Sequence, residues 1–134
     1  MRLQQVLLLL MRIGATVQLV LGIGFWTGHW SSAIGTHMSI GTVYVLLLWL
    51  MAVIALFQRR NIGVALLAIP WGFGVAMLGY GQHRILEGSD FHWIVRVVHL
   101  VVGVASLAFA ERLTKPAGSP DAGAHLQLRT PAGD

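Results

Sequence analysis

One stretch near the end of the chain decides how the rest is organised: Phe91-His92-Trp93-Ile94-Val95-Arg96-Val97-Val98-His99-Leu100-Val101-Val102-Gly103. It is apolar enough to lie in a bilayer, yet it carries two histidines and an arginine. At about 100° per residue on a helix, Arg96 lies roughly 40° from His92, and His99 lies roughly 20° to the other side. The three side chains therefore share one face. Ionisable groups inside a membrane segment are costly, so such a face is expected to line a bundle interior, a cofactor or a cavity.

Composition places the chain in a membrane. Its 134 residues are 56% hydrophobic and only 10% charged, whereas a soluble domain is about a quarter charged. Apolar runs cover residues 3–26, 33–57, 62–80 and 91–110, and each is about as long as a bilayer-spanning helix. Each run must be helical, because a backbone in lipid has to satisfy its own hydrogen bonds. The sequence predicts an all-α, integral membrane, up-down-up-down four-helix bundle over residues 1–113.

The chain also shows an internal repeat. His29 follows the first span and His83 follows the third, while the second and fourth spans carry the matching segments His37-Met-Ser-Ile-Gly41 and His99-Leu-Val-Val-Gly103. This is the pattern of a duplicated two-helix hairpin. It predicts that the second and fourth helices occupy equivalent positions across the bundle.

Basic residues indicate the orientation in the membrane. One side of the predicted bundle carries Arg2, Arg59, Arg60, Arg112 and Lys115. On the other side, Arg84 is balanced by Glu87 and Asp90. The positive-inside rule then puts both termini in the cytoplasm, with the protein in the inner membrane. Arg12 is expected to extend toward the cytoplasmic face. The histidines that cluster toward the outer side are His29, His37, His83 and His92.

Residues 114–134 are expected to form a disordered tail. They contain three of the four prolines together with Gly, Ala and Ser, and they cannot bury enough apolar surface to fold alone.

Charge and cysteine content exclude several classes of function. The net charge of +4 and the pI near 10.8 are explained by arginines that flank membrane spans, so no nucleic-acid partner is predicted. The absence of cysteine excludes disulfides, thiolate metal sites, iron–sulfur clusters and covalently attached c-type haem.

A noncovalent haem is the cofactor that the histidine pattern favours. Ligation by two histidines needs imidazoles from different helices at one depth, with small residues beside them so that the macrocycle can approach. His37 with Gly41 and His99 with Gly103 supply this pattern, so we predict one haem b with His37 and His99 on the iron. Arg96, one turn from His99, is placed to pair with a haem propionate.

The second ligand has two candidates. Counting residues from the cytoplasmic ends of the helices favours His92 as the partner of His37, whereas the matching glycine and the deeper position favour His99. His99 is preferred, and His92 is the alternate ligand or a residue that supports the ligand.

These segments also resemble a known class. The segment from His37 to Gly41 and the segment from His92 to Gly103 resemble the ligand helices of small b-type cytochromes, the four-helix membrane cytochromes and haem-bearing anchor subunits of respiratory oxidoreductases. The resemblance implies two histidine ligands and electron transfer between quinone or quinol and a protein partner. The chain departs from the dihaem members, which have a more regular set of four ligands, although its histidines leave room for a second haem.

Three function classes follow from these observations. The first is a cytochrome b-like electron-transfer protein or subunit, more a non-catalytic component than an enzyme by itself. The second is a non-redox accessory or assembly subunit of a larger membrane complex. The third is a small metal-handling membrane protein, in which the outer-side histidines bind zinc or copper.

Overall fold

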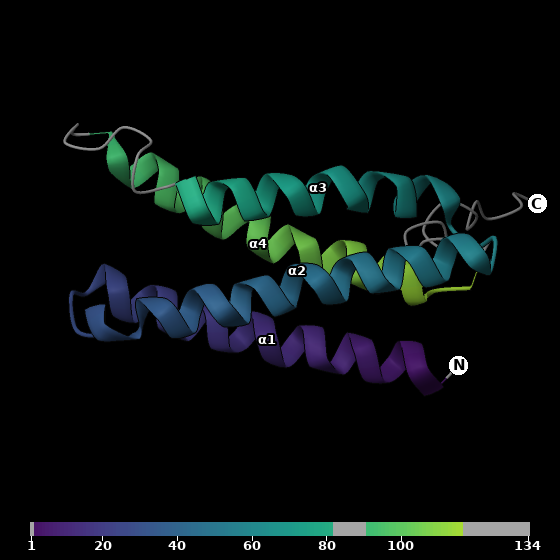
Figure 1. Cartoon of the computed structure of the whole chain (residues 1–134), viewed down its shortest axis with the longest axis horizontal. Helices are drawn as coiled ribbons and strands as arrows, with labels where there is room; N and C mark the ends of the chain where they lie inside the picture. The colour runs from purple at the N-terminus through teal and green to yellow at the C-terminus, as the bar shows by residue number, and fades with distance from the viewer. Residues whose placement is uncertain (1, 82–90, 117–134) are drawn as a thin grey trace, which may run out of the picture.

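The computed structural model describes residues 2–81 and 91–116, which form four long helices and one short 3-10 turn. The elements are α1 (Arg2–Trp26), η1 (Ser31–Ala33), α2 (Ile34–Phe57), α3 (Ile62–Gly81) and α4 (His92–Thr114) (Figure 1). All four long helices are long and apolar enough to cross a membrane. The predicted all-α, four-helix membrane fold is confirmed.

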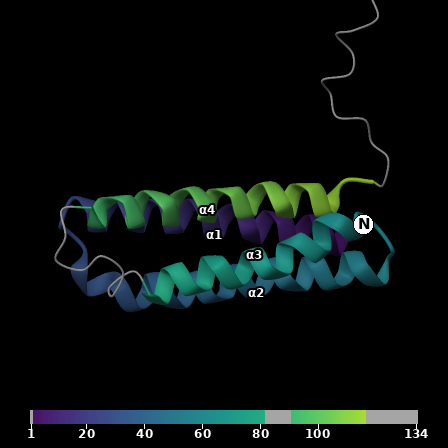
Figure 2. The ribbon, with the colours of Figure 1, turned by 90° about the horizontal axis from the view of Figure 1, so that it is seen from above.

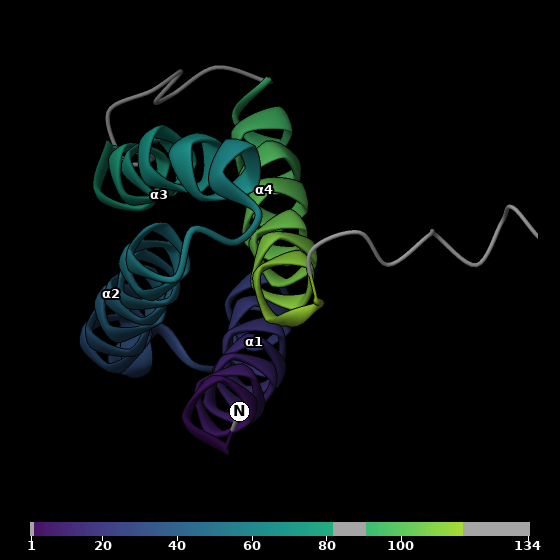
Figure 3. The ribbon, with the colours of Figure 1, turned by 90° about the vertical axis from the view of Figure 1, so that its right-hand side faces the viewer.

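The helices pack in sequence order around the bundle, with α1 next to α2, α2 next to α3, α3 next to α4 and α4 next to α1 (Figures 2 and 3). Across the bundle, α2 and α4 approach each other more closely than α1 and α3. The second and fourth helices therefore occupy the diagonal positions expected of a repeated hairpin, although the duplication itself stays a prediction.

One end of the bundle holds the start of α1, the α2–α3 turn and the end of α4, and we call it the basic end after Arg59, Arg60, Arg112 and Lys115 (Figure 1). Polar contacts tie these segments together. Gln4 Nε2 donates to Gln58 Oε1 over 3.1 Å, and Arg60 Nη1 donates to Gln4 Oε1 over 3.2 Å.

Helix α4 runs to Thr114, one turn beyond the predicted boundary at residue 110. The α2–α3 turn explains the difference, because its side chains satisfy the last carbonyl groups of α4. Arg60 Nη2 donates to the Thr114 carbonyl over 3.1 Å, and Asn61 Nδ2 donates to the Arg112 carbonyl over 2.8 Å. Leu113 is also fully buried. Of the predicted tail, residues 117–134 lie outside the described residues.

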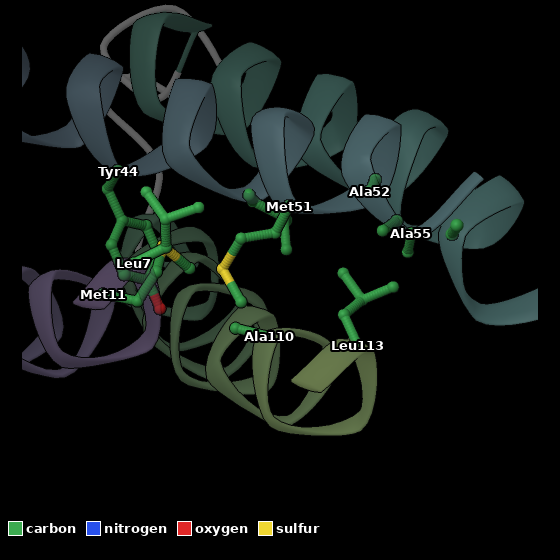
Figure 4. Close-up of a cluster of buried hydrophobic side chains, with 11 residues drawn as sticks. Leu7, Met11, Tyr44, Met51, Ala52, Ala55, Ala110 and Leu113 are labelled. Carbon is green, nitrogen blue, oxygen red and sulfur yellow. The ribbon is translucent and has the colours of Figure 1, made fainter. Parts of the chain in front are cut away.

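The apolar core lies in the half of the bundle near the basic end. Met51 of α2 packs between the helices with Ala110 and Leu113 of α4, while Leu7 and Met11 of α1 lie beside Tyr44 (Figure 4). The remaining members are mostly alanines of α2 and α3. Small side chains let helices approach closely in lipid, where packing rather than water exclusion holds them together.

Indole groups add directed contacts between helices. Trp49 of α2 packs against Gly72 of α3 and donates from Nε1 to the Ile69 carbonyl over 3.0 Å. Trp71 of α3 donates from Nε1 to Ser106 Oγ of α4 over 3.1 Å. Both tryptophans therefore pack α3 to its neighbours.

Arg12 has a partner that the sequence did not reveal. Its Nη2 lies 2.9 Å from Glu111 Oε1, in an ion pair that joins α1 to α4. The ion pair lowers the cost of placing a guanidinium in a spanning helix. The expected extension of Arg12 toward the cytoplasmic face stays a prediction.

Candidate functional site: a histidine-lined cavity

A cavity of about 430 Å³ opens among the four helices, in the half of the bundle away from the basic end. The cavity walls come from α1, α2, α3 and α4, with contributions from the α1–α2 connection. All the predicted cofactor-binding residues whose side chains are described line it: His37, Gly41, Arg96, His99 and Gly103. Residues that lie 55 (Gly41 to Arg96) to 66 (His37 to Gly103) positions apart in the sequence thus meet at one place, because α2 and α4 occupy diagonal positions in the bundle.

His37 and His99 face one another across this cavity. Their ring centroids lie 6.3 Å apart and their planes make an angle of 61°. Phe25 of α1 packs edge-on against His37, with the ring centroids 5.2 Å apart. Both histidines are half-buried. The fold therefore brings together the two histidines that the matching segments singled out.

Polar atoms around the cavity lack partners. Gln18 Oε1, His37 Nδ1 and His99 Nδ1 are buried, and none has a hydrogen-bond partner within residues 2–81 and 91–116. Buried polar groups without partners are costly, more so in a bilayer where water does not compensate them. The concentration of such atoms around one cavity is the property expected of a ligand site.

Glycines shape the cavity in two ways. Gly22 of α1 and Gly103 of α4 line it, and a Cβ added at either would meet no atom within 4 Å, so both leave open space beside the backbone. Gly79 and Gly41 instead make room for neighbouring side chains. A Cβ at Gly79 would lie 3.3 Å from His99 Cε1, and one at Gly41 would lie 2.7 Å from Gln18 Nε2.

Arg96 stands at the cavity one turn before His99 on α4. Its side chain is exposed, and it forms no hydrogen bond or ion pair with any residue that the structure describes. A guanidinium in a spanning helix without a counter-ion requires an anion or polar headgroup from elsewhere. Arg96 is thus available to an anionic group of a molecule in the cavity.

Hydroxyl groups close the cavity below and beside the histidines. The Tyr44 hydroxyl of α2 donates to the Gly103 carbonyl of α4 over 3.1 Å, and Tyr44 is buried. On the α2–α3 side, Thr42 Oγ1 and Tyr80 Oη lie 2.8 Å apart. Because the Thr42 hydroxyl donates to the Met38 carbonyl over 2.9 Å, its bond with Tyr80 must receive the hydrogen from Tyr80.

Of the other predicted histidines, the structure describes the side chain of His29. His29 lines a separate depression beside Trp30 rather than the cavity. His92 begins α4, but its side chain lies outside the described residues, as does His83. The described part of the chain contains no group of three or more His, Asp or Glu side chains placed to hold a metal ion.

Gln18 and Gly79 also line the cavity, but their sequence context did not predict which residues they would contact. Gln18 lies in a stripe with Gly14 and Gly22 at intervals of four, which is suited to close helix contact or to a flat ligand. Gly79 was one of several glycines in its span, and only the tertiary structure places it against His99.

Comparison of the chain with protein-family models, with proteins of curated function and with solved structures gave no match. The fold and the cavity by themselves define a four-helix membrane protein in which two imidazoles from diagonal helices face one another.

Proposed function

We propose that this chain is a haem b-binding electron-transfer protein of the inner membrane, or a subunit with that role. In this proposal it passes electrons between quinone or quinol and a protein redox partner. The observation that carries the proposal is the placement of His37 and His99, with ring centroids 6.3 Å apart across a glycine-lined cavity.

The separation of the two rings fits a shared metal ion. Imidazole nitrogens bind a transition metal at about 2 Å, and the ring centre lies about 1 Å behind the nitrogen. Two imidazoles that hold one metal ion therefore have centroids no more than about 6 Å apart, and the observed 6.3 Å is close to this limit, so His37 and His99 could hold the same ion. An angle of 61° between the planes is compatible with this arrangement, because each ring can rotate about its bond to the metal.

The cavity supports a flat, mostly apolar ligand with an anionic edge. Its volume of about 430 Å³ lies in the range of small-molecule and cofactor sites. Gly22 and Gly103 leave space for a ring system beside α1 and α4, and Arg96 offers a cation to a propionate. We assign iron ligation to His37 and His99, and contact with the macrocycle to Gly41 and Gly103.

A bound haem would supply the one-electron chemistry, and the protein would set its ligands, burial and local charge. The described residues do this by holding two imidazoles at a fixed spacing, by excluding water with apolar walls and by placing Arg96 at the edge. We propose one haem, both termini in the cytoplasm and the histidine pair toward the outer side. Nothing in the described chain supplies a separate redox domain, so the electrons must pass to a partner.

The metal-handling alternative receives less support. It needs His29 and His37 in one site, yet His29 lies in a different depression. The accessory-subunit alternative makes a different prediction, a protein that stays colourless when haem is supplied.

The test is a reduced-minus-oxidised visible spectrum of the detergent-purified protein from cells supplied with haem. We expect a b-type α-band that disappears in His37→Ala and in His99→Ala. His29→Ala is the matched control, since His29 lies outside the cavity, and it should keep the band. If the α-band is lost in His37→Ala and His92→Ala but kept in His99→Ala, the second ligand is His92 and not His99. A colourless wild-type protein would overturn the haem proposal.

A further inference from the structure

Arg59 occupies a backbone position that normally belongs to glycine. Helix α2 ends at Phe57 with Gln58 as its C-cap. Beyond it, the Arg60 amide donates to the Ala55 carbonyl over 2.9 Å and the Arg59 amide donates to the Leu56 carbonyl over 3.0 Å. This pair of bonds is the Schellman motif, whose residue just past the helix adopts the left-handed conformation. Arg59 is that residue, with φ of 53°.

An arginine in this conformation is held at a cost in stability that glycine would avoid. The Arg59 side chain does not offset that cost within the fold. It is exposed, and it forms no hydrogen bond or ion pair with any residue in 2–81 or 91–116. Arg60, the next residue, shows the contrast, because its guanidinium donates to the carbonyls of Thr114 and Lys115. The guanidinium of Arg59 is therefore available to a partner beyond the described residues.

The surroundings of Arg59 are positively charged. Asn61 Nδ2 lies 2.8 Å from the Arg112 carbonyl and 3.0 Å from the Lys115 carbonyl, so the α2–α3 turn and the end of α4 are held together (Figure 1). Glu111 is the acidic residue of this part of α4, and it is already engaged by Arg12. The first turn of α3, which follows the turn directly, contains no acidic side chain.

We propose that the basic end binds the headgroup of an anionic phospholipid, with Arg59 as the main contact and Arg112 beside it. A turn between two spanning helices lies at the headgroup level of the bilayer, where a phosphate can accept charge-assisted hydrogen bonds from a guanidinium. The lipid contact explains why an exposed arginine is kept at a glycine position. This site is independent of the histidine-lined cavity and of its cofactor.

The experiment compares thermal unfolding of the purified full chain in a neutral detergent with three additions: phosphatidylglycerol, phosphatidylcholine, or inorganic phosphate. The variants are wild type, Arg59→Gly, Arg59→Lys and the charge-matched control Arg84→Gln in the α3–α4 connection. Native mass spectrometry of each sample counts the phosphatidylglycerol molecules that stay bound.

We expect phosphatidylglycerol to raise the wild-type unfolding temperature by several degrees, with no such shift from phosphatidylcholine or inorganic phosphate. Arg59→Gly should unfold at a higher temperature than wild type in detergent alone, because the strained residue is gone, and it should lose most of the lipid-dependent shift. Arg59→Lys should keep part of the shift and Arg84→Gln all of it. An undiminished shift in Arg59→Gly would overturn the assignment, and an equal shift with inorganic phosphate would overturn the lipid as the partner.

Discussion

The hydroxyl of Tyr44 and the carbonyl of Gly103 join the two helices that carry the facing histidines. The bond is 3.1 Å long. Gly103 follows His99 by one turn on α4, and Tyr44 follows His37 by two turns on α2. Because α2 and α4 are diagonal, few other contacts set the distance between them. Tyr44 therefore holds the spacing on which the imidazole pair depends.

Replacing this hydroxyl should loosen the pair. We expect Tyr44→Phe to lower the free energy of unfolding by about 0.6–1.5 kcal/mol, the range for an interhelical hydrogen bond. Chemical unfolding in detergent measures this loss. If haem is bound, the electron paramagnetic resonance spectrum of the oxidised protein should also change, since it reports the ligand geometry. Thr16→Val removes a hydroxyl that donates to the Arg12 carbonyl of the same helix and does not line the cavity, so it should leave that spectrum unchanged. Equal effects of the two variants would contradict the role of Tyr44.

A methyl group at Gly103 should affect ligand binding and spare the fold. An added Cβ meets no protein atom there, and alanine favours helix by up to about 1 kcal/mol over glycine. We therefore expect Gly103→Ala to fold at least as stably as wild type but to retain less haem. Gly35→Ala on α2 also adds a methyl in open space and does not line the cavity, so it serves as the control. Haem content per protein, from absorbance, decides the outcome, and full retention in Gly103→Ala would count against a macrocycle beside α4.

Two glycines of α3 should respond differently to the same change. A Cβ at Gly72 would collide with the Trp49 indole, whereas one at Gly74 would meet nothing within 4 Å. Gly72→Ala should cost about 1–3 kcal/mol of stability through overpacking, while Gly74→Ala should be neutral or slightly stabilising. Thermal unfolding of both variants in the same detergent measures the difference. Similar stabilities of the two variants would contradict the prediction, because they would show that α2 and α3 can move apart around the Trp49 indole without a loss of stability.

The ion pair between Arg12 and Glu111 should make the protein more stable than variants that keep only one of the two charges. Removing one partner leaves an uncompensated charge on a spanning helix, so Arg12→Leu and Glu111→Leu should each destabilise the protein. The double variant should be more stable than either single variant. Since the side chains are 56% and 43% exposed, we expect a coupling energy of only about 1 kcal/mol. A double-mutant cycle in lipid bicelles gives this value, and strictly additive losses would contradict a functional pair.

Much of the fold could be predicted because its determinants are local. The thickness of a bilayer sets the length of an apolar run, so four runs predicted four spanning helices with boundaries close to those observed. Helical periodicity is equally local, and it placed Arg96 and His99 on the face that lines the cavity. The matching segments around His37 and His99 identified the pair that the bundle brings together.

Only the tertiary structure decided the depth of each side chain in the bundle, its contacts on other helices and the residue at which α4 ends. These properties depend on how separate helices pack against one another. The tertiary structure placed the His99 ring beside His37 and Gly79, at a depth that counting residues from the helix ends does not give. It extended α4 to Thr114, since Arg60 and Asn61 satisfy carbonyl groups that no local pattern would cap. Periodicity along one helix says which residues share a face, whereas the level at which two faces meet is set by close packing between the helices.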